Sequence, residues 1–110
     1  MKNKVSLNSA FESLKKSKDP FATVFTHGTL EIEIYKPDKV DLQQPHDRDE
    51  AYIISSGSGK FELENEISEV NTGDFLFVPA GAQHRFLEFT NDFSTWVIFY
   101  GPIGGEAENI

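Results

Sequence analysis

The chain contains no cysteine, and none of its apolar runs is as long as a membrane span. The first absence excludes a disulfide framework and zinc sites built on thiolates. The second excludes a transmembrane helix, and the polar first twenty residues do not match a secretory signal peptide. These absences predict a cytoplasmic protein. A length of 110 residues leaves little room for more than one domain.

Basic residues are also scarce. Ten Lys and Arg stand against 18 Asp and Glu, which gives a formal net charge of −8. Five of the lysines fall within residues 1–19, so the rest of the chain is more acidic still. Such a surface repels phosphate backbones and anionic lipids. We therefore expect neither nucleic acid nor a membrane surface as a partner.

Residues 1–19 predict a short helical segment, because their apolar residues recur at helical spacing: Leu7, Ala10, Phe11 and Leu14. Ser9 and Glu12 stand three apart and predict a capping box at its start, and Pro20 ends the segment. A helix this short is marginal on its own. We expect it to lie across the following domain and to bury Phe11 and Leu14.

From residue 22 the pattern changes to a period of two, which predicts strands. In residues 30–35 Leu and Ile alternate with Glu and Tyr, which indicates one buried and one wet face. Further strands are predicted at 51–55, 60–64, 67–70, 75–78, 83–89 and 93–100, with Gly or Pro at the turns. Many short strands predict a sandwich or barrel. The last, FSTWVIFY, is apolar on both faces, so it is either central or covered by the helix or a second subunit.

Two segments carry chemistry-bearing residues at a distinctive spacing. In QPHDRDEAYIISSG, three residues separate His46 from Glu50, and six separate Glu50 from Gly57. In GDFLFVPAGAQHRFLE, five residues separate Gly73 from a Pro-x-Gly turn, and His84 follows after two more. These are the spacings of the two motifs of the cupin superfamily, which this chain resembles over about half its length. The matching Gly and Pro positions are interpreted as turn residues without a catalytic role.

The resemblance implies a small single-domain bacterial cupin. Its fold would be all-β, a double-stranded β-helix jelly-roll barrel over residues 20–110, with residues 1–19 as the N-terminal helical segment. The tail FYGPIGGE is similar to that of small stand-alone bacterial cupins. Such proteins are often homodimers, so we expect a homodimer in which residues 93–100 offer surface for the partner.

The residues of the two motifs predict a metal site. If the strands that carry them face each other, His46, Glu50 and His84 meet inside an aromatic barrel. An uncompensated carboxylate there is costly unless a cation or hydrogen bonds offset its charge. Two imidazoles and one carboxylate suit Mn, Fe, Co, Ni or Zn. The alternative is a metal-free polar cluster of the same residues.

The chain departs from the family pattern at two positions. Gln44 stands where the first motif has its first His, and in extended backbone it shares a face with His46. We expect Gln44 to be a weak or switchable metal ligand. Glu88 replaces the closing Asn of the second motif and is interpreted either as a second cavity carboxylate or as a solvated rim residue.

Three further sets of residues receive predictions. Tyr52 and Phe86 share strand parity with Glu50 and His84, so they are the aromatics expected to contact a small-molecule ligand, together with Glu88. Residues 47–49, Asp-Arg-Asp, are interpreted as a solvated turn. His27, beside a glycine, is interpreted as a structural histidine of a strand or loop.

Three functions remain open from the sequence. The first is a metal-dependent enzyme on a small organic molecule, of dioxygenase or isomerase and epimerase type. The second is a non-catalytic module that binds or senses a small ligand through its metal. The third is a metal-free structural dimer. The resemblance does not choose among them, because one fold hosts many activities.

Overall fold

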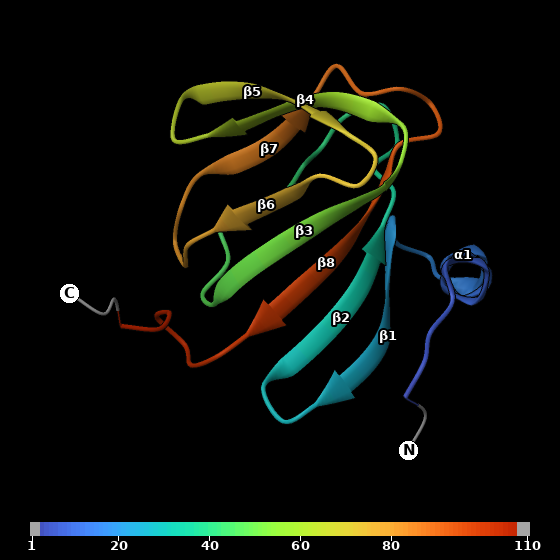
Figure 1. Ribbon diagram of the computed structural model, residues 1–110, viewed down its shortest axis with the longest axis horizontal. Helices are drawn as coiled ribbons and strands as arrows, with labels where there is room; N and C mark the ends of the chain where they lie inside the picture. Colours follow the sequence, from blue (N-terminus) through green and yellow to red (C-terminus); the bar gives the residue numbers. More distant parts are fainter. Residues whose placement is uncertain (1–2, 108–110) are drawn as a thin grey trace.

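The structure is a computed structural model that describes residues 3–107, which form two antiparallel sheets and one helix (Figure 1). The larger sheet has the order β1 (Phe21–His27), β2 (Leu30–Tyr35), β8 (Ser94–Tyr100), β3 (Asp49–Ser56), β6 (Phe75–Val78). The smaller sheet has the order β5 (Glu66–Asn71), β4 (Ser58–Leu63), β7 (His84–Leu87). The predicted all-β jelly-roll architecture is confirmed.

The core lies between the two sheets and is dominated by aromatic rings. Phe61 and Phe86 have ring centroids 4.9 Å apart, and Phe86 and Phe93 lie at 4.8 Å. Tyr52 packs edge-on against Phe86 at 5.0 Å. Tilted and edge-on pairs are the favoured arrangements of aromatic quadrupoles. The aromatic side chains therefore fill one continuous interior, with aliphatic residues of both sheets around them.

The helix α1 (Leu7–Lys16) packs against β1 and β2 and buries Ala10 completely. The predicted capping box is wrong, because the helix begins one turn earlier. Ser6 is the N-cap, and its hydroxyl accepts a hydrogen bond from the Ser9 amide at 3.1 Å. Phe11 and Leu14 are half-buried. Among the described residues no helix is long and apolar enough to cross a membrane.

Strand β2 uses its two faces differently from the sequence expectation. Ile34 is fully buried, as expected for a residue of the apolar face. The opposite face is not simply wet, because Glu31, Glu33 and Tyr35 line a cavity and are half-buried or buried. Alternation identified the strand correctly. It could not tell bulk solvent from a polar cavity.

Strand β8 is central in the larger sheet, between β2 and β3. This resolves the expectation for FSTWVIFY in favour of a central strand. Val97 and Phe99 point into the interior and are buried, whereas Trp96 and Ile98 are half-buried on the outer face. A strand with neighbours on both edges and contacts on both faces requires apolar residues at consecutive positions.

Two of the motif glycines hold turns that other side chains would disturb. Gly57 has φ +75°, and a Cβ there would lie 2.7 Å from the backbone of Phe93. Gly81 has φ +82°, and its amide donates to the carbonyl of His46 at 2.7 Å. That bond ties the turn before β7 to the loop before β3. Gly81 therefore both shapes a turn and holds the two motifs close to each other in space.

Candidate metal centre

The two motifs converge at one point of the interior. His46 lies in the loop before β3, Glu50 is the second residue of β3, and His84 is the first residue of β7 in the other sheet. Glu50 Oε1 lies 3.3 Å from His84 Nε2 and 3.8 Å from His46 Nε2. Candidate ligand atoms of all three residues lie within 4.8 Å of one another. These three residues could therefore hold one metal ion.

The cluster contains an unusual concentration of unpaired polar atoms. Among the described residues, the buried side-chain atoms without a hydrogen-bond partner are both carboxylate oxygens of Glu50 and Nε2 of His84. Glu50 is completely buried. Leaving such atoms unpaired costs about 1–3 kcal/mol each, and more for charged groups. When no proton lies between Glu50 Oε1 and His84 Nε2, which are 3.3 Å apart, a bound cation would satisfy the lone pairs of all three atoms.

Hydrogen bonding fixes which nitrogen of His84 faces Glu50. Nδ1 lies 2.9 Å from the carbonyl oxygen of Ala82, and a carbonyl can only accept, so Nδ1 carries the proton. Nε2 of the neutral ring is then a lone pair directed at the cluster. A backbone carbonyl that fixes the tautomer in this way is the usual support of a histidine metal ligand.

The electrostatics of the cluster follow from burial and from the carboxylate. Burial alone lowers the pKa of His84, but Glu50 and the Ala82 carbonyl favour the cation, and together they raise the pKa of His84 above its usual value. Burial, reinforced by the charge of Glu50, holds the pKa of the Tyr52 phenol well above its usual range. Without a metal, a proton on His84 is thus the available counter-charge for Glu50. A divalent cation would compete with that proton for the same lone pair.

The two donor separations that involve Glu50 are close to those around a single ion. Ligand bonds of about 2.0–2.2 Å that meet at tetrahedral or octahedral angles separate neighbouring donor atoms by roughly 3.0–3.6 Å. The His84–Glu50 separation of 3.3 Å lies in this range, and the His46–Glu50 separation of 3.8 Å is slightly longer. The donor set, two neutral imidazoles and a carboxylate, is also one that divalent transition metals accept.

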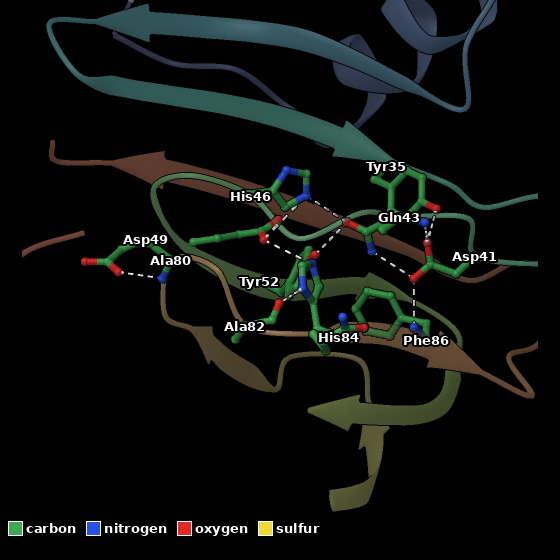
Figure 2. A network of polar contacts seen from close by, with 12 residues as sticks. Tyr35, Asp41, Gln43, His46, Asp49, Tyr52, Ala80, Ala82, His84 and Phe86 are labelled. Carbon is green, nitrogen blue, oxygen red and sulfur yellow. Dashed lines mark hydrogen bonds and ion pairs between the residues drawn. The ribbon is translucent and has the colours of Figure 1, made fainter. Parts of the chain in front are cut away.

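The loop between β2 and β3 is held against the cluster by a buried carboxylate. Asp41 is 6% exposed and accepts hydrogen bonds from the Tyr35 hydroxyl at 2.6 Å and the Phe86 amide at 2.8 Å. It also accepts from Nε2 of Gln43 at 2.8 Å. Figure 2 shows Gln43 lying between Asp41 and His46. This chain of contacts links β2, the loop and β7 around the candidate site.

Gln44, the residue expected as a fourth ligand, is exposed, and its neighbour Gln43 takes the place beside the cluster. Gln43 Oε1 accepts from the Tyr52 hydroxyl at 2.9 Å and lies 3.4 Å from His46 Nε2. The parity argument required extended backbone that continues into β3. That strand begins only at Asp49, so counting in twos does not transfer across the loop. Neither Gln43 nor Asp41 belongs to a motif, and the repeated Gln was the only signal that the sequence offered.

The interpretation of residues 47–49 as a solvated turn is wrong for Asp49. Asp49 is 5% exposed, and its carboxylate accepts from the amides of Ala80 and Glu106 at 3.0 and 2.8 Å. It therefore joins the turn before β7 and the C-terminal segment to β3. The sequence could not show this, because both amide donors are distant along the chain.

Beside the cluster lies a cavity of about 730 Å³. His46 and Glu50 form part of its wall, and β2 contributes Glu31 and Glu33. Arg48 closes one side: its guanidinium donates to Glu31 at 2.9 Å and to the carbonyl of Thr29 at 2.7 Å. It also lies over the ring of Phe99, 5.6 Å from the centroid, so Arg48 is committed to structural partners. A cavity of this size accommodates a small organic molecule.

The carboxylates of β2 give this wall a protonatable group near neutrality. Glu33 is half-buried, and burial raises the pKa of its carboxyl, with further contributions from the charges of Glu31 and Glu50, to about 7. Crowded carboxylates that cannot all ionise share protons in this manner. The cavity wall thus presents a carboxyl group that can donate or accept a proton at ordinary pH.

The three residues expected to contact a ligand occupy different places. Tyr52 belongs to the cluster through its bond to Gln43, and its ring lies 6.2 Å from that of His84. Phe86 is in the aromatic core below the cluster, 1% exposed. Glu88 is exposed, and its carboxylate pairs with Lys60 at 3.0 Å. The structure therefore brings Tyr52 to the cluster, and it does not bring Glu88 there.

Residues 31–98 match the cupin domain family, and the chain belongs to it. The sequence is also 36% identical over 62 residues to an uncharacterised protein of Streptomyces coelicolor. That match covers 56% of this chain and 59% of the relative, so the chain spans little more than half of the relative's length. The resemblance inferred from the motif spacing is confirmed.

Solved structures of low sequence identity share the fold. A cupin-2 domain protein of Shewanella frigidimarina superimposes with a TM-score of 0.70 at 14% identity, covering 88% of this chain and 94% of that one. KdgF from a Halomonas species gives 0.64 at 20%, covering 73% and 76%. The DMSP lyase DddQ of Ruegeria pomeroyi gives 0.64 at 21%, covering 74% of this chain and 46% of the other. At these identities the likeness establishes the fold alone.

Proposed function

We propose that this cupin binds one divalent metal ion through His46, Glu50 and His84 and uses it to act on a small organic molecule in the adjacent cavity. The observation that carries the proposal is the convergence of unpaired buried atoms from two sheets on one point. A structural cluster would be expected to satisfy its own hydrogen bonds. A cation supplies the missing partner for all three atoms at once.

Each residue near the site has a distinct part in this proposal. A bound divalent ion of Mn, Fe, Co, Ni or Zn would act as a Lewis acid or as a site for O₂. His84, with its tautomer fixed by Ala82, presents its lone pair without reorganisation. Glu33 supports the enzymatic reading, because a carboxyl with a pKa of about 7 can exchange a proton with a cavity ligand at Oε. Isomerase or dioxygenase chemistry is compatible with this arrangement.

Elemental analysis of protein purified without an affinity tag tests the metal directly. We expect close to one equivalent of a divalent transition metal in the wild type and none in His84→Ala. His27→Ala is the matched control, because His27 is exposed at the end of β1 and outside the cluster. Far-ultraviolet circular dichroism verifies that both variants are folded. Full occupancy in His84→Ala would show that the ligand assignment is wrong.

Turnover separates an enzyme from a binding module. The metal-loaded protein should convert at least one member of a panel of small hydroxylated and carboxylated compounds, tested with and without O₂. Dependence on O₂ indicates a dioxygenase, and independence indicates an isomerase or epimerase. Tight binding of a panel member without conversion would instead establish the non-catalytic module. Glu33→Gln should lower turnover while leaving the metal content unchanged.

We also propose that the chain forms a homodimer through the outer face of the larger sheet. Ile53 pairs with Phe75 and Trp96 across neighbouring strands, and Phe77 lies next along β6. Phe75 is 63% exposed and Phe77 43%. A contiguous apolar patch on a chain of net charge −8 is typical of an interface, and two-fold dimers are the commonest assemblies. Light scattering should give twice the chain mass for the wild type and the monomer mass for Phe77→Lys.

A further inference from the structure

Gln43 is the polar side chain beside the cluster that the motifs do not account for. Its Nε2 donates to Asp41 Oδ2 at 2.8 Å. The opposite orientation of the amide would set its oxygen against a carboxylate oxygen, so this bond decides which end points inward. The inward atom is Oε1, which accepts from the Tyr52 hydroxyl and lies 3.4 Å from Nε2 of His46.

The distance between Gln43 Oε1 and His46 Nε2 is long for a hydrogen bond but suits two ligands of one metal ion. If Nε2 of His46 is a lone pair, as metal ligation requires, both atoms of the pair are acceptors and neither can donate. The 3.4 Å between these two acceptors is close to the 3.3 and 3.8 Å that separate Glu50 Oε1 from the two histidine nitrogens. An amide oxygen has two lone pairs. One accepts from Tyr52, and the second is free for a cation.

The position of Gln43 Oε1 is fixed by hydrogen bonds at the other end of the side-chain amide and at the backbone. Asp41 fixes the amide of Gln43 and is itself fixed by Tyr35 of β2 and by the Phe86 amide of β7. Asp41 also accepts from the Gln43 backbone amide at 3.1 Å. Three elements therefore immobilise one side chain whose oxygen is directed at the cluster. Such support is what orients the ligands of metal sites.

We propose that Oε1 of Gln43, rather than any atom of Gln44, is the fourth protein donor to the divalent ion held by His46, Glu50 and His84, with Asp41 as its positioning residue. This inference rests on the proposed metal function. A neutral oxygen donor completes the set without a second negative charge, so the loaded site keeps a net positive charge. It would also couple metal binding to the order of the loop between β2 and β3.

The two adjacent glutamines provide a matched test. Co²⁺ is titrated into metal-free wild type, Gln43→Met and Gln44→Met, and affinity is measured by calorimetry and coordination by visible absorption. Methionine keeps the length of the side chain and removes the amide oxygen. We expect Gln43→Met to bind about 10–100-fold more weakly, with altered Co²⁺ absorption bands. Gln44→Met should match the wild type in both measurements.

The outcomes separate this inference from the proposed function. Wild-type protein that takes up no Co²⁺ refutes the metal function, and this inference with it. Wild type that binds, with Gln43→Met equal to it in affinity and spectrum, overturns the role of Gln43 alone. If Gln43→Met fails to fold by circular dichroism, Gln43→Ala takes its place. Asp41→Asn should weaken Co²⁺ binding in the same direction as Gln43→Met, and an affinity equal to that of the wild type would overturn the positioning role of Asp41.

Discussion

The interior of this barrel has two parts that are built on opposite principles. The rings of Phe61, Phe86 and Phe93 are apolar, nearly completely buried, and each in contact with another ring. Around Glu50 and His84 the side chains are equally buried, but polar atoms face one another without partners. The first part follows the rule that packing stabilises a fold. The second sacrifices stability for a group of buried polar residues that needs a proton on His84 or a bound cation to balance the charge of Glu50.

The sharpest test of the packed part is Phe86→Ala. Removing this ring leaves a cavity among Tyr52, Phe61 and Phe93, and we expect the free energy of unfolding to fall by about 3–5 kcal/mol. Urea denaturation of the metal-free protein measures the loss. Leu42→Ala is the control, because Leu42 is 81% exposed and its removal should change stability by less than about 0.5 kcal/mol. Equal losses in the two variants would contradict the assignment of the core.

The opposite result is expected at the cluster, with Glu50→Met. This change removes a completely buried carboxylate and lets His84 remain neutral. Replacing both members of a buried ion pair by apolar groups often stabilises by about 1–4 kcal/mol, and here the second member, His84, loses its charge when Glu50 is removed. The metal-free variant should therefore unfold at higher urea concentration than the wild type, and added metal should no longer stabilise it.

A matched pair of measurements checks this trade of stability for function. Glu69→Met alters an exposed glutamate of β5 and should leave both urea stability and the metal response as they are in the wild type. A loss of stability in Glu50→Met would mean that the metal-free cluster is satisfied and that the two parts of the interior do not differ in kind.

The hydrogen bond between Tyr35 and Asp41 connects the packed core to the loop beside the polar cluster. Tyr35→Phe tests how much this bond contributes to stability. The hydroxyl donates to Asp41 at 2.6 Å in a buried setting, so its removal should lower the free energy of unfolding by about 1–2 kcal/mol. Tyr100→Phe is the control, because Tyr35 pairs with Thr95 near the start of β8 and Tyr100 is the last residue of that strand. Amide hydrogen exchange should show faster opening of residues 38–46 in Tyr35→Phe alone, and no change there would show that Asp41 holds the loop without Tyr35.

The sequence predicted the part of the site that strands carry. The motif spacing identified His46, Glu50 and His84. The turns at Gly57 and Gly81 bring the strands that carry these residues together. The central place of β8 was one of the two alternatives that its apolar residues left open, because local composition records that both faces are covered but not by what.

The sequence did not predict the part of the site that the loop carries. Gln43 and Asp41 gain their roles from partners far along the chain, such as the amide of Phe86. The same holds for Asp49, whose partners lie near residues 80 and 106. Strand parity is a local rule and fails where backbone leaves the ladder. Hydrogen bonds between distant segments leave no periodic trace in a sequence.

The smallest expected effect lies on the cavity wall, where Glu33 belongs to neither part. Its carboxyl has a pKa of about 7 in the folded protein against 4.5 as the ordinary value. Between these values the folded state binds the proton more tightly than the unfolded state. The contribution of Glu33 therefore makes the protein more stable at low pH and less stable as pH rises from about 4.5 to 7.

Glu33→Gln isolates that contribution. Urea unfolding of metal-free wild type and variant is followed from pH 4 to 8, and the difference between the two free energies should change in this window and level off above it. The change should be small, because the side chain is only half-buried and water screens it. Glu69→Gln, on an exposed face, should give a flat difference. A flat difference for Glu33→Gln as well would mean that burial and the charges of Glu31 and Glu50 do not raise the pKa of this carboxyl. The cavity would then lack the proton-exchanging group on which the proposed enzymatic function relies.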